Sequence, residues 1–305
     1  MRVLVTGGAG FIGSHVAEAC VAAGHEVAVL DDLSSGKRAQ VPEGARFFEA
    51  DIRAPAGAAA MAEFGCEVLV HHAAQMDVRR SVADPRFDAD VNLRGLLNLL
   101  EAGRENGLRR VLFASSGGAG YGEQSEFPAP ETHALAPMSP YGVAKVAGEL
   151  YLQCYHSIYG IEWVGMRYAN VYGPRQDPHG EAGVVAIFAQ KLLAGETPTI
   201  NGDGGQTRDY VFVGDLVRAN LALLESSFCG PLNFGTGIET DVNTLHTHLA
   251  EACGRAGLSP SHGPAKPGEQ RRSVISPARA GEVLGWIPET PLDQGIAATV
   301  AFFRG

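Results

Sequence analysis

Tyr141 and Lys145 are the two residues of this sequence whose types and spacing are best suited to proton transfer. Both lie near the start of a helix predicted over residues 140–159. Positions four residues apart share one helix face, so the phenol and the ammonium can converge on one point. A phenol has a pKa near 10, and lowering it to about 7 requires roughly 4 kcal/mol of preference for the anion. A neighbouring ammonium supplies part of this preference, although the same spacing also occurs by chance in amphipathic helices.

Ser115 and Ser116 strengthen this interpretation because they end a predicted strand, 111–113, that precedes the helix. A serine hydroxyl at the carboxyl end of such a strand could hydrogen-bond the same substrate oxygen that Tyr141 deprotonates. We therefore predict Tyr141, Lys145 and Ser116 as the catalytic residues.

A glycine-rich turn follows the first predicted strand, 2–5, and opens a helix that ends near residue 24. Glycine lets the backbone approach a ligand closely, and the first amides of the helix favour an anion. Glycine turns end many strands, so this pattern alone is weak. The glycines that we expect to line a pyrophosphate are Gly7, Gly10 and Gly13.

Asp31 and Asp32 end the second predicted strand, 26–30, about twenty residues after the glycines. An acidic residue there accepts hydrogen bonds from the adenosine ribose and repels a 2′-phosphate, which favours NAD over NADP. Lys37 and Arg38 follow closely and leave NADP open as an alternative.

The elements that would position these residues alternate between strand and helix. Further strands are predicted at 45–48, 68–70, 111–113 and 163–166, and long helices at 85–106 and 140–159. This alternation predicts an α/β fold, a Rossmann-type doubly wound parallel sheet whose ligands lie beyond the carboxyl ends of the strands.

After about residue 173 the strands become short, and glycine and proline are frequent. We predict a dinucleotide-binding domain over 1–172 and a smaller, mixed α/β substrate-binding domain over 173–305, part of which can return to the main sheet. Helices are expected at 183–194, 215–225, 242–253 and 292–303.

The composition limits the partners. A formal net charge of -10 argues against nucleic acid and anionic membranes. No apolar run approaches the roughly 20 residues needed to span a bilayer, and a strand beginning at residue 2 leads us to expect no signal peptide. Five scattered cysteines favour a reducing, cytoplasmic location. Neighbouring His71 and His72 point to opposite faces of a strand, so we expect no metal site.

Taken together, the glycine turn, Asp31, the serine-rich strand end and the Tyr141/Lys145 pair resemble the extended short-chain dehydrogenase/reductase family. Segments 72–75, 92–95, 167–175 and 208–213 resemble its sugar-nucleotide branch, and the likeness covers nearly the whole chain. The resemblance implies permanently held NAD, a UDP-sugar substrate, and epimerisation at C4 that interconverts UDP-glucose and UDP-galactose through a 4-keto sugar. It also implies a homodimer joined by the two long helices.

The resemblance further assigns site residues. For the cofactor it adds Phe11, Ile12, Ser35, Gly36, Asp51, Ile52, His72, Ala73, Ala74, Gln75, Asn92, Ser115 and Tyr168, with Lys145 bonded to the nicotinamide ribose. For the substrate it implies Ser116, Gly117, Tyr141, Asn170, Arg175, Arg208, Arg271 and Ser273.

The sequence departs from the family pattern at Gly117, where relatives carry the catalytic Ser or Thr. Either the backbone turns there and brings Ser116 round, or water fills the gap. Dehydratase relatives carry an Asp-Glu pair just afterwards, but Gly118 and Ala119 stand here, which argues against elimination of water.

Residues 266–269 resemble an Arg-x-Gly-Asp stretch of the family with Lys266 for Arg and Glu269 for Asp. Counting from this stretch, Ser273 falls beside the sugar's C2, and its small size predicts room for an N-acetyl group. His179 lies in a loop that we expect to border the substrate. The alternatives are a UDP-uronate C4 epimerase or decarboxylase, and a non-catalytic NAD-binding sensor, which would have no reason to keep Tyr141 and Lys145.

Overall fold

The computed structural model describes residues 1–178, 183–265 and 270–305, and its centre is a seven-stranded parallel sheet. The strand order is β11-β6-β5-β4-β1-β2-β3. The strands are β1 (Arg2–Thr6), β2 (Glu26–Asp31), β3 (Arg46–Glu49), β4 (Val68–His71), β5 (Arg110–Ser116), β6 (Glu162–Tyr168) and β11 (Gly230–Phe234). This confirms the predicted doubly wound parallel sheet.

Helices cover both faces of the sheet because side chains alternate along each strand. Val3 and Val5 of β1 pack in one core with α1 (Phe11–Ala22) and α9 (Val213–Glu225). Leu4 packs in the opposite core. The helices of that opposite core are α2 (Pro55–Phe64), α5 (Gly95–Glu105) and α7 (Pro140–Tyr159).

The prediction of a single long helix over 85–106 is wrong in detail. The segment consists of α4 (Pro85–Ala89), a π-helical turn η2 (Asp90–Arg94) and then α5. Wider turns of this kind often occur at functional sites. Here the turn contains Asn92, whose side chain hydrogen-bonds Asp88 and the backbone of Gln75.

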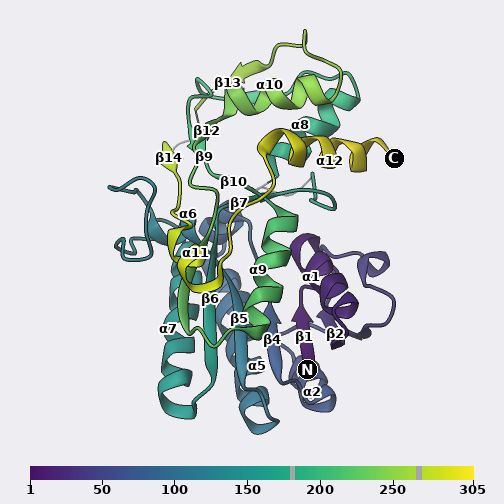
Figure 1. The fold of residues 1–305 in the computed structure, drawn as a ribbon, viewed down its shortest axis with the longest axis vertical. Coiled ribbons are helices and arrows are strands. Elements are labelled where there is room, and N and C mark those ends of the chain that lie inside the picture. The colour runs from purple at the N-terminus through teal and green to yellow at the C-terminus, as the bar shows by residue number, and fades with distance from the viewer. Residues whose placement is uncertain (179–182, 266–269) are drawn as a thin grey trace.

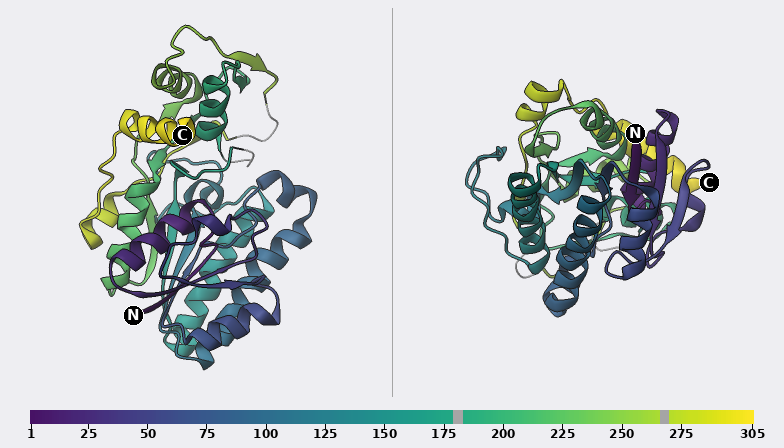
Figure 2. Two further views of the ribbon diagram at one scale, coloured as in Figure 1. Left: turned by 90° about the vertical axis from the view of Figure 1, so that its right-hand side faces the viewer. Right: turned by 90° about the horizontal axis from the view of Figure 1, so that it is seen from below.

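A third core lies in the C-terminal part, between α8 (Val184–Leu193), α10 (Val242–Ala252) and α12 (Leu292–Arg304). These helices form a lobe at one end of the molecule, and β1 runs toward that end (Figures 1 and 2). The C-terminal part also returns to the main body, since β11 pairs with β6 and α9 packs on α1.

Short elements connect the sheet and the lobe. The helical ones are η1 (Arg38–Gln40), α3 (Val78–Ala83), α6 (Gly117–Tyr121) and α11 (Ala278–Leu284). The strands are β7 (Asn170–Tyr172), β8 (Thr199–Asn201), β9 (Thr207–Arg208), β10 (Tyr210–Phe212), β12 (Thr240–Asp241), β13 (Ser261–Gly263) and β14 (Arg272–Ser273). Among the described residues, no helix combines the length and apolar character that a membrane crossing requires.

Candidate active site

The glycine turn after β1 is packed too closely for larger residues. Gly7 adopts a φ of 66°, and a β-carbon there would lie 2.7 Å from the Ala73 nitrogen. A β-carbon at Gly13 would collide with the carbonyl oxygen of Gly7. The glycine turn therefore lies directly against the residues that follow β4, and the first turn of α1 lies directly against the glycine turn, as a cradle for a pyrophosphate requires.

Asp31 fixes this turn from the end of β2. Its carboxylate accepts hydrogen bonds from the Ala9 nitrogen at 3.0 Å and the Leu33 nitrogen at 2.9 Å. Burial raises the pKa of Asp31, and these two donors oppose the rise. Each carboxylate oxygen has a further lone pair, so the residue still fits a ribose hydroxyl. Arg38 stacks on the Phe47 ring, with its guanidinium carbon 4.2 Å from the ring centroid.

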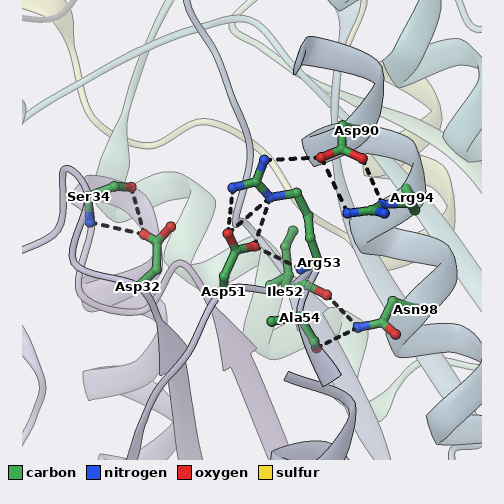
Figure 3. A network of polar contacts seen from close by, with 9 residues as sticks. All are labelled: Asp32, Ser34, Asp51, Ile52, Arg53, Ala54, Asp90, Arg94 and Asn98. Carbon is green, nitrogen blue, oxygen red and sulfur yellow. Dashed lines mark hydrogen bonds and ion pairs between the residues drawn. The ribbon is translucent and has the colours of Figure 1, made fainter. Parts of the chain in front are cut away.

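Asp51 lies in a charged network at the edge of the cofactor region, where Arg53 bridges Asp51 and Asp90 (Figure 3). The Arg53 hydrogen bonds lower the pKa of Asp51. Asn98 of α5 donates to the carbonyl oxygens of Ile52 and Ala54 at 2.7 and 3.1 Å. These contacts fix the loop after β3.

Tyr141 and Lys145 lie together near the start of α7, as predicted. Ser139 caps this helix by accepting from the Gly142 nitrogen at 3.1 Å, and Pro140 occupies its first position. The Lys145 ammonium lies 5.6 Å from the Tyr141 ring centroid and 5.0 Å from the Phe113 ring centroid. The Tyr141 phenol and the Lys145 ammonium thus lie on one face of α7 and point to the same region.

The protein alone does not favour ionisation of this phenol. Burial raises the pKa of Tyr141, and the nearby Asp88 carboxylate raises it further. Burial lowers the pKa of Lys145 to about 8, and Asp88 opposes this decrease. A positively charged nicotinamide ring near the phenol would act in the direction that ionisation needs.

The two serines at the end of β5 have different environments. Ser115 is buried and donates to Glu149 Oε1 at 2.5 Å, so its hydroxyl proton is used within the protein and its oxygen remains an acceptor only. Ser116 is half-buried, and its Oγ accepts from the Ala119 nitrogen at 3.3 Å, which leaves its proton available to donate. The backbone does turn at Gly117, where α6 begins.

Gly117 has no space for the Ser or Thr of relatives. A β-carbon at this position would lie 2.9 Å from Ile275 Cγ2, and one at Gly118 would lie 3.0 Å from Ser273 Oγ. Ser273 is buried beside this glycine pair and forms a register pair with Arg208 in β14 and β9. The structure thus brings Gly117, Ser273 and Arg208 close together although they are far apart in sequence.

Of the other cofactor residues expected around the end of β4, His72 stacks on Tyr168 and its Nε2 lies 3.2 Å from the Tyr168 hydroxyl. Gln75 and Asn92 exchange two hydrogen bonds of 2.9 Å. Burial lowers the pKa of both His71 and His72 to about 3, so both imidazoles are neutral near pH 7.

Three of the expected substrate residues have less direct support. Arg175 pairs with Glu18 of α1 at 2.7 Å, and the exposed Arg271 pairs with Asp203 at 2.7 Å. Asn170 uses its backbone nitrogen to bond the Asp209 carbonyl at 2.8 Å. Both arginines therefore already use some of their donors on a carboxylate within the chain. The predictions on His179 and on residues 266–269 lie outside the described residues.

Sequence reasoning missed several residues that shape the site. Glu149 and Arg167 form a buried, two-point ion pair of 2.6 and 3.0 Å between α7 and β6. Asp209 is buried and accepts from Thr236 and from the Gly237 nitrogen. In the sequence, Glu149 and Asp209 are noticeable only as charged residues among apolar or motif residues. That signal does not identify the group that each carboxylate contacts.

The fold and the site define a dinucleotide-binding protein of the Rossmann type with a tyrosine–lysine pair beyond its strand ends. Residues 3–233 match the family model described as NAD dependent epimerase/dehydratase family, and the chain belongs to this family.

Three similar proteins extend this result. A UDP-glucose 4-epimerase of Mycolicibacterium smegmatis is 49% identical, with 100% of this chain and 99% of the relative covered. The Thermotoga maritima UDP-glucose 4-epimerase crystallised with UDP-glucose is 45% identical, with a TM-score of 0.96 and coverage of 100% and 99%. The Thermus thermophilus UDP-glucose 4-epimerase in complex with NAD is 49% identical, with a TM-score of 0.94 and the same coverage.

Proposed function

We propose that this protein is an NAD-dependent UDP-hexose 4-epimerase that interconverts UDP-glucose and UDP-galactose. The observation that carries the proposal is the placement of Tyr141 and Lys145 on one face of α7, with Lys145 5.6 Å from the Tyr141 ring. Full-length similarity to two UDP-glucose 4-epimerases, one solved with UDP-glucose and one with NAD, supports it.

The chemistry requires one base and one hydride acceptor. NAD, when bound, would supply a reversible acceptor for the hydride of the sugar C4. The 4-keto sugar would turn over in the pocket before the hydride returned to its other face, which inverts C4. Tyr141 takes the proton of the 4-hydroxyl and later gives it back, while Lys145 stabilises the phenolate and binds the cofactor's ribose. Ser116 donates a hydrogen bond to the same sugar oxygen. No net oxidation results, so the cofactor need not be exchanged.

The cofactor would lie along the glycine turn, with Asp31 at the adenosine ribose. The close packing of Gly7 and Gly13 and the remaining lone pairs of Asp31 support this placement. Asp32, Ser35, Gly36 and Asp51 stay predicted contacts on the adenosine side, and His72–Gln75 and Tyr168 on the nicotinamide side.

The substrate would lie between Tyr141 and the β9–β14 pair. Arg208 and Ser273 are register partners there, which supports their joint role at the diphosphate and the sugar. Because Ser273 is small and adjoins Gly118, we also propose that an N-acetyl group at C2 is accepted.

The test is to incubate the purified protein with UDP-galactose, UDP-GalNAc and UDP-galacturonate and to separate the products. We expect UDP-glucose from the first and UDP-GlcNAc from the second. Conversion of UDP-galacturonate alone would replace the proposal by a uronate enzyme, and failure with UDP-GalNAc would remove the N-acetyl proposal.

Tyr141→Phe is the matching variant. We expect turnover to fall by about a hundredfold or more, because the proton acceptor is lost while the ring remains. The nucleotide content after purification should not change. Tyr151→Phe, an exposed position on the same helix, is the control. Turnover of Tyr141→Phe at the native rate would refute the assignment.

We further propose a homodimer and a cytoplasmic location. α7 carries an exposed stripe at helical spacing that consists of Val143, Leu150, Cys154 and Ile158. A Tyr155–Glu101 hydrogen bond of 2.5 Å joins α7 to α5 beside it. The α5–α7 pair of one protomer can therefore pack against the α5–α7 pair of a second copy. All five cysteines are free, which suits a reducing compartment.

A further inference from the structure

Asp88 is a buried carboxylate that the proposed mechanism does not use. It lies on α4, which packs against α7, and only 1% of its surface is exposed. A charged side chain is rarely buried to this degree without a partner of opposite charge. Its surroundings therefore need an explanation.

Two amides hold one oxygen of this carboxylate. Oδ1 accepts from Gln75 Nε2 and from Asn92 Nδ2, both at 3.0 Å. The amides are themselves fixed, because Asn92 exchanges two hydrogen bonds with the Gln75 backbone. The other oxygen, Oδ2, is buried and has no hydrogen-bond partner. The carboxylate is thus locked by its first oxygen and cannot turn toward a new partner without breaking two bonds.

The charge of Asp88 nevertheless acts on the reacting pair. It raises the pKa of Lys145 against the effect of burial, and it adds to the rise of the pKa of Tyr141. Lys145 in turn opposes the burial effect that raises the pKa of Asp88. Among the described residues, the hydrogen-bond partners of Asp88 are the two amides on Oδ1, Oδ2 has none, and no ion pair joins the carboxylate to Lys145.

The other charged groups around Lys145 are neutral, internally paired or exposed. His71 and His72 at the end of β4 are neutral, because burial lowers their pKa to about 3. Six elements pack on α7, namely α3, α4, α6, η2, β5 and β6. Among the described residues, the other charged groups of α7 and of these elements near the pair are the ion-paired Glu149 and Arg167, the ion-paired Asp90 and Arg94, the ion-paired Arg110 and Glu162, and the exposed Arg79, Arg80 and Arg86.

We propose that Asp88 is a positioning residue, a counter-charge to Lys145 that its amide bonds keep out of contact with the ammonium. This inference rests on the proposed function. Direct pairing would occupy the ammonium donors that the cofactor ribose and the phenolate need. A carboxylate held at a distance stabilises the ammonium and leaves those donors free.

The test is Asp88→Asn, which keeps the accepting oxygen and removes the charge. Turnover needs Tyr141 deprotonated and Lys145 protonated, so these groups set the acidic and the alkaline limb of the kcat profile. Loss of a negative charge lowers both pKa values, since it destabilises the ammonium and no longer repels the phenolate. We expect both limbs of the pH profile of the NAD-loaded enzyme to move to lower pH by about one unit.

Asp84→Asn is the matched control. It removes an equal charge at the exposed start of α4 and keeps a side chain able to cap the helix. Its pH profile should equal that of the native enzyme. If kcat of Asp88→Asn is lower by the same factor at every pH and both limbs stay in place, the role of Asp88 is merely structural and the inference is overturned. An equal shift of the limbs in Asp84→Asn would also overturn it.

A second readout does not depend on turnover. The absorbance of tyrosinate is titrated in Asp88→Asn and in the double variant Asp88→Asn/Tyr141→Phe, and the difference between the two curves gives the pKa of Tyr141 without Asp88. The same difference between the native protein and Tyr141→Phe gives the pKa of Tyr141 with Asp88 present. The first pKa should be lower than the second, and equal values refute the inference. If native protein shows no epimerisation, the proposed function fails while this titration still decides the role of Asp88. Should Asp88→Asn not fold, Asp88→Ser removes the same charge.

Discussion

At the scale of single residues, the proposed chemistry depends on what surrounds Tyr141 more than on the residue itself. Burial raises the pKa of this phenol, and the Asp88 carboxylate acts in the same direction. The ammonium of Lys145 and a bound cationic ring must therefore supply the opposite effect, which explains why a base of this kind is useful only in the assembled site.

Ser116 gives a prediction at this scale. Replacing Ser116 by Ala removes the hydroxyl that would bond the sugar oxygen, so kcat should fall by about a hundredfold. The variant also loses a helix cap, which costs about 1 kcal/mol of unfolding free energy and is measured separately by thermal unfolding. Ser116→Thr keeps a hydroxyl and should retain turnover. Native turnover in Ser116→Ala would mean that Ser116 has no role.

At the scale of elements, α7 positions the site because it is fixed to the sheet at two points. Glu149 forms a buried ion pair with Arg167 of β6 and also accepts from Ser115 of β5. One residue earlier, Gly148 lets the helix lie directly on Phe113, since a β-carbon there would be 2.6 Å from the ring. The position of Lys145 relative to β4 and β5 follows from these contacts.

Gly148→Ala tests this attachment. The added methyl group would overlap Phe113, so unfolding free energy should fall by about 1–3 kcal/mol and kcat should fall with it. Gly281→Ala in α11 is the control, because its nearest neighbour is 3.6 Å away and alanine favours a helix by up to about 1 kcal/mol. Denaturant unfolding and kcat would be measured on both, and equal stability of the two variants would contradict the attachment.

At the scale of the whole molecule, the exposed side of α7 is the surface that we assign to a second copy. Leu150 and Ile158 are 65% and 63% exposed, which is unusual for large apolar residues on one helix stripe. The opposite side of the same helix carries the site. Dimer formation would therefore hold α7 between the sheet and the partner.

Leu150→Glu should convert the dimer into a monomer, because two buried charges would meet across a two-fold axis. Light scattering gives the mass directly. Ile238→Glu changes an equally exposed residue of the C-terminal part and should leave the mass unchanged. If the native protein is already a monomer, the proposed dimer is refuted.

The extent to which the sequence predicted this protein varied with the range of the contacts. The alternation of strands and helices that predicts a parallel sheet, the glycine turn and the pairing of Tyr141 with Lys145 are local patterns, and the structure confirms them. The break at η2 was not predicted, because a π-helical turn has no period of its own in a run of apolar residues. Nor did the sequence indicate that Ser115 would be used by Glu149.

The sequence by itself determined the order of strands and helices, the dinucleotide turn and one reacting face of one helix. These follow from periodicity and from residues fewer than about five positions apart along the chain. Only the tertiary structure decided which carboxylate lies near which cation. It alone also placed Ser273 beside Gly118. Charges and hydrogen-bonding groups act through space, and the chain brings distant segments together only when its cores pack.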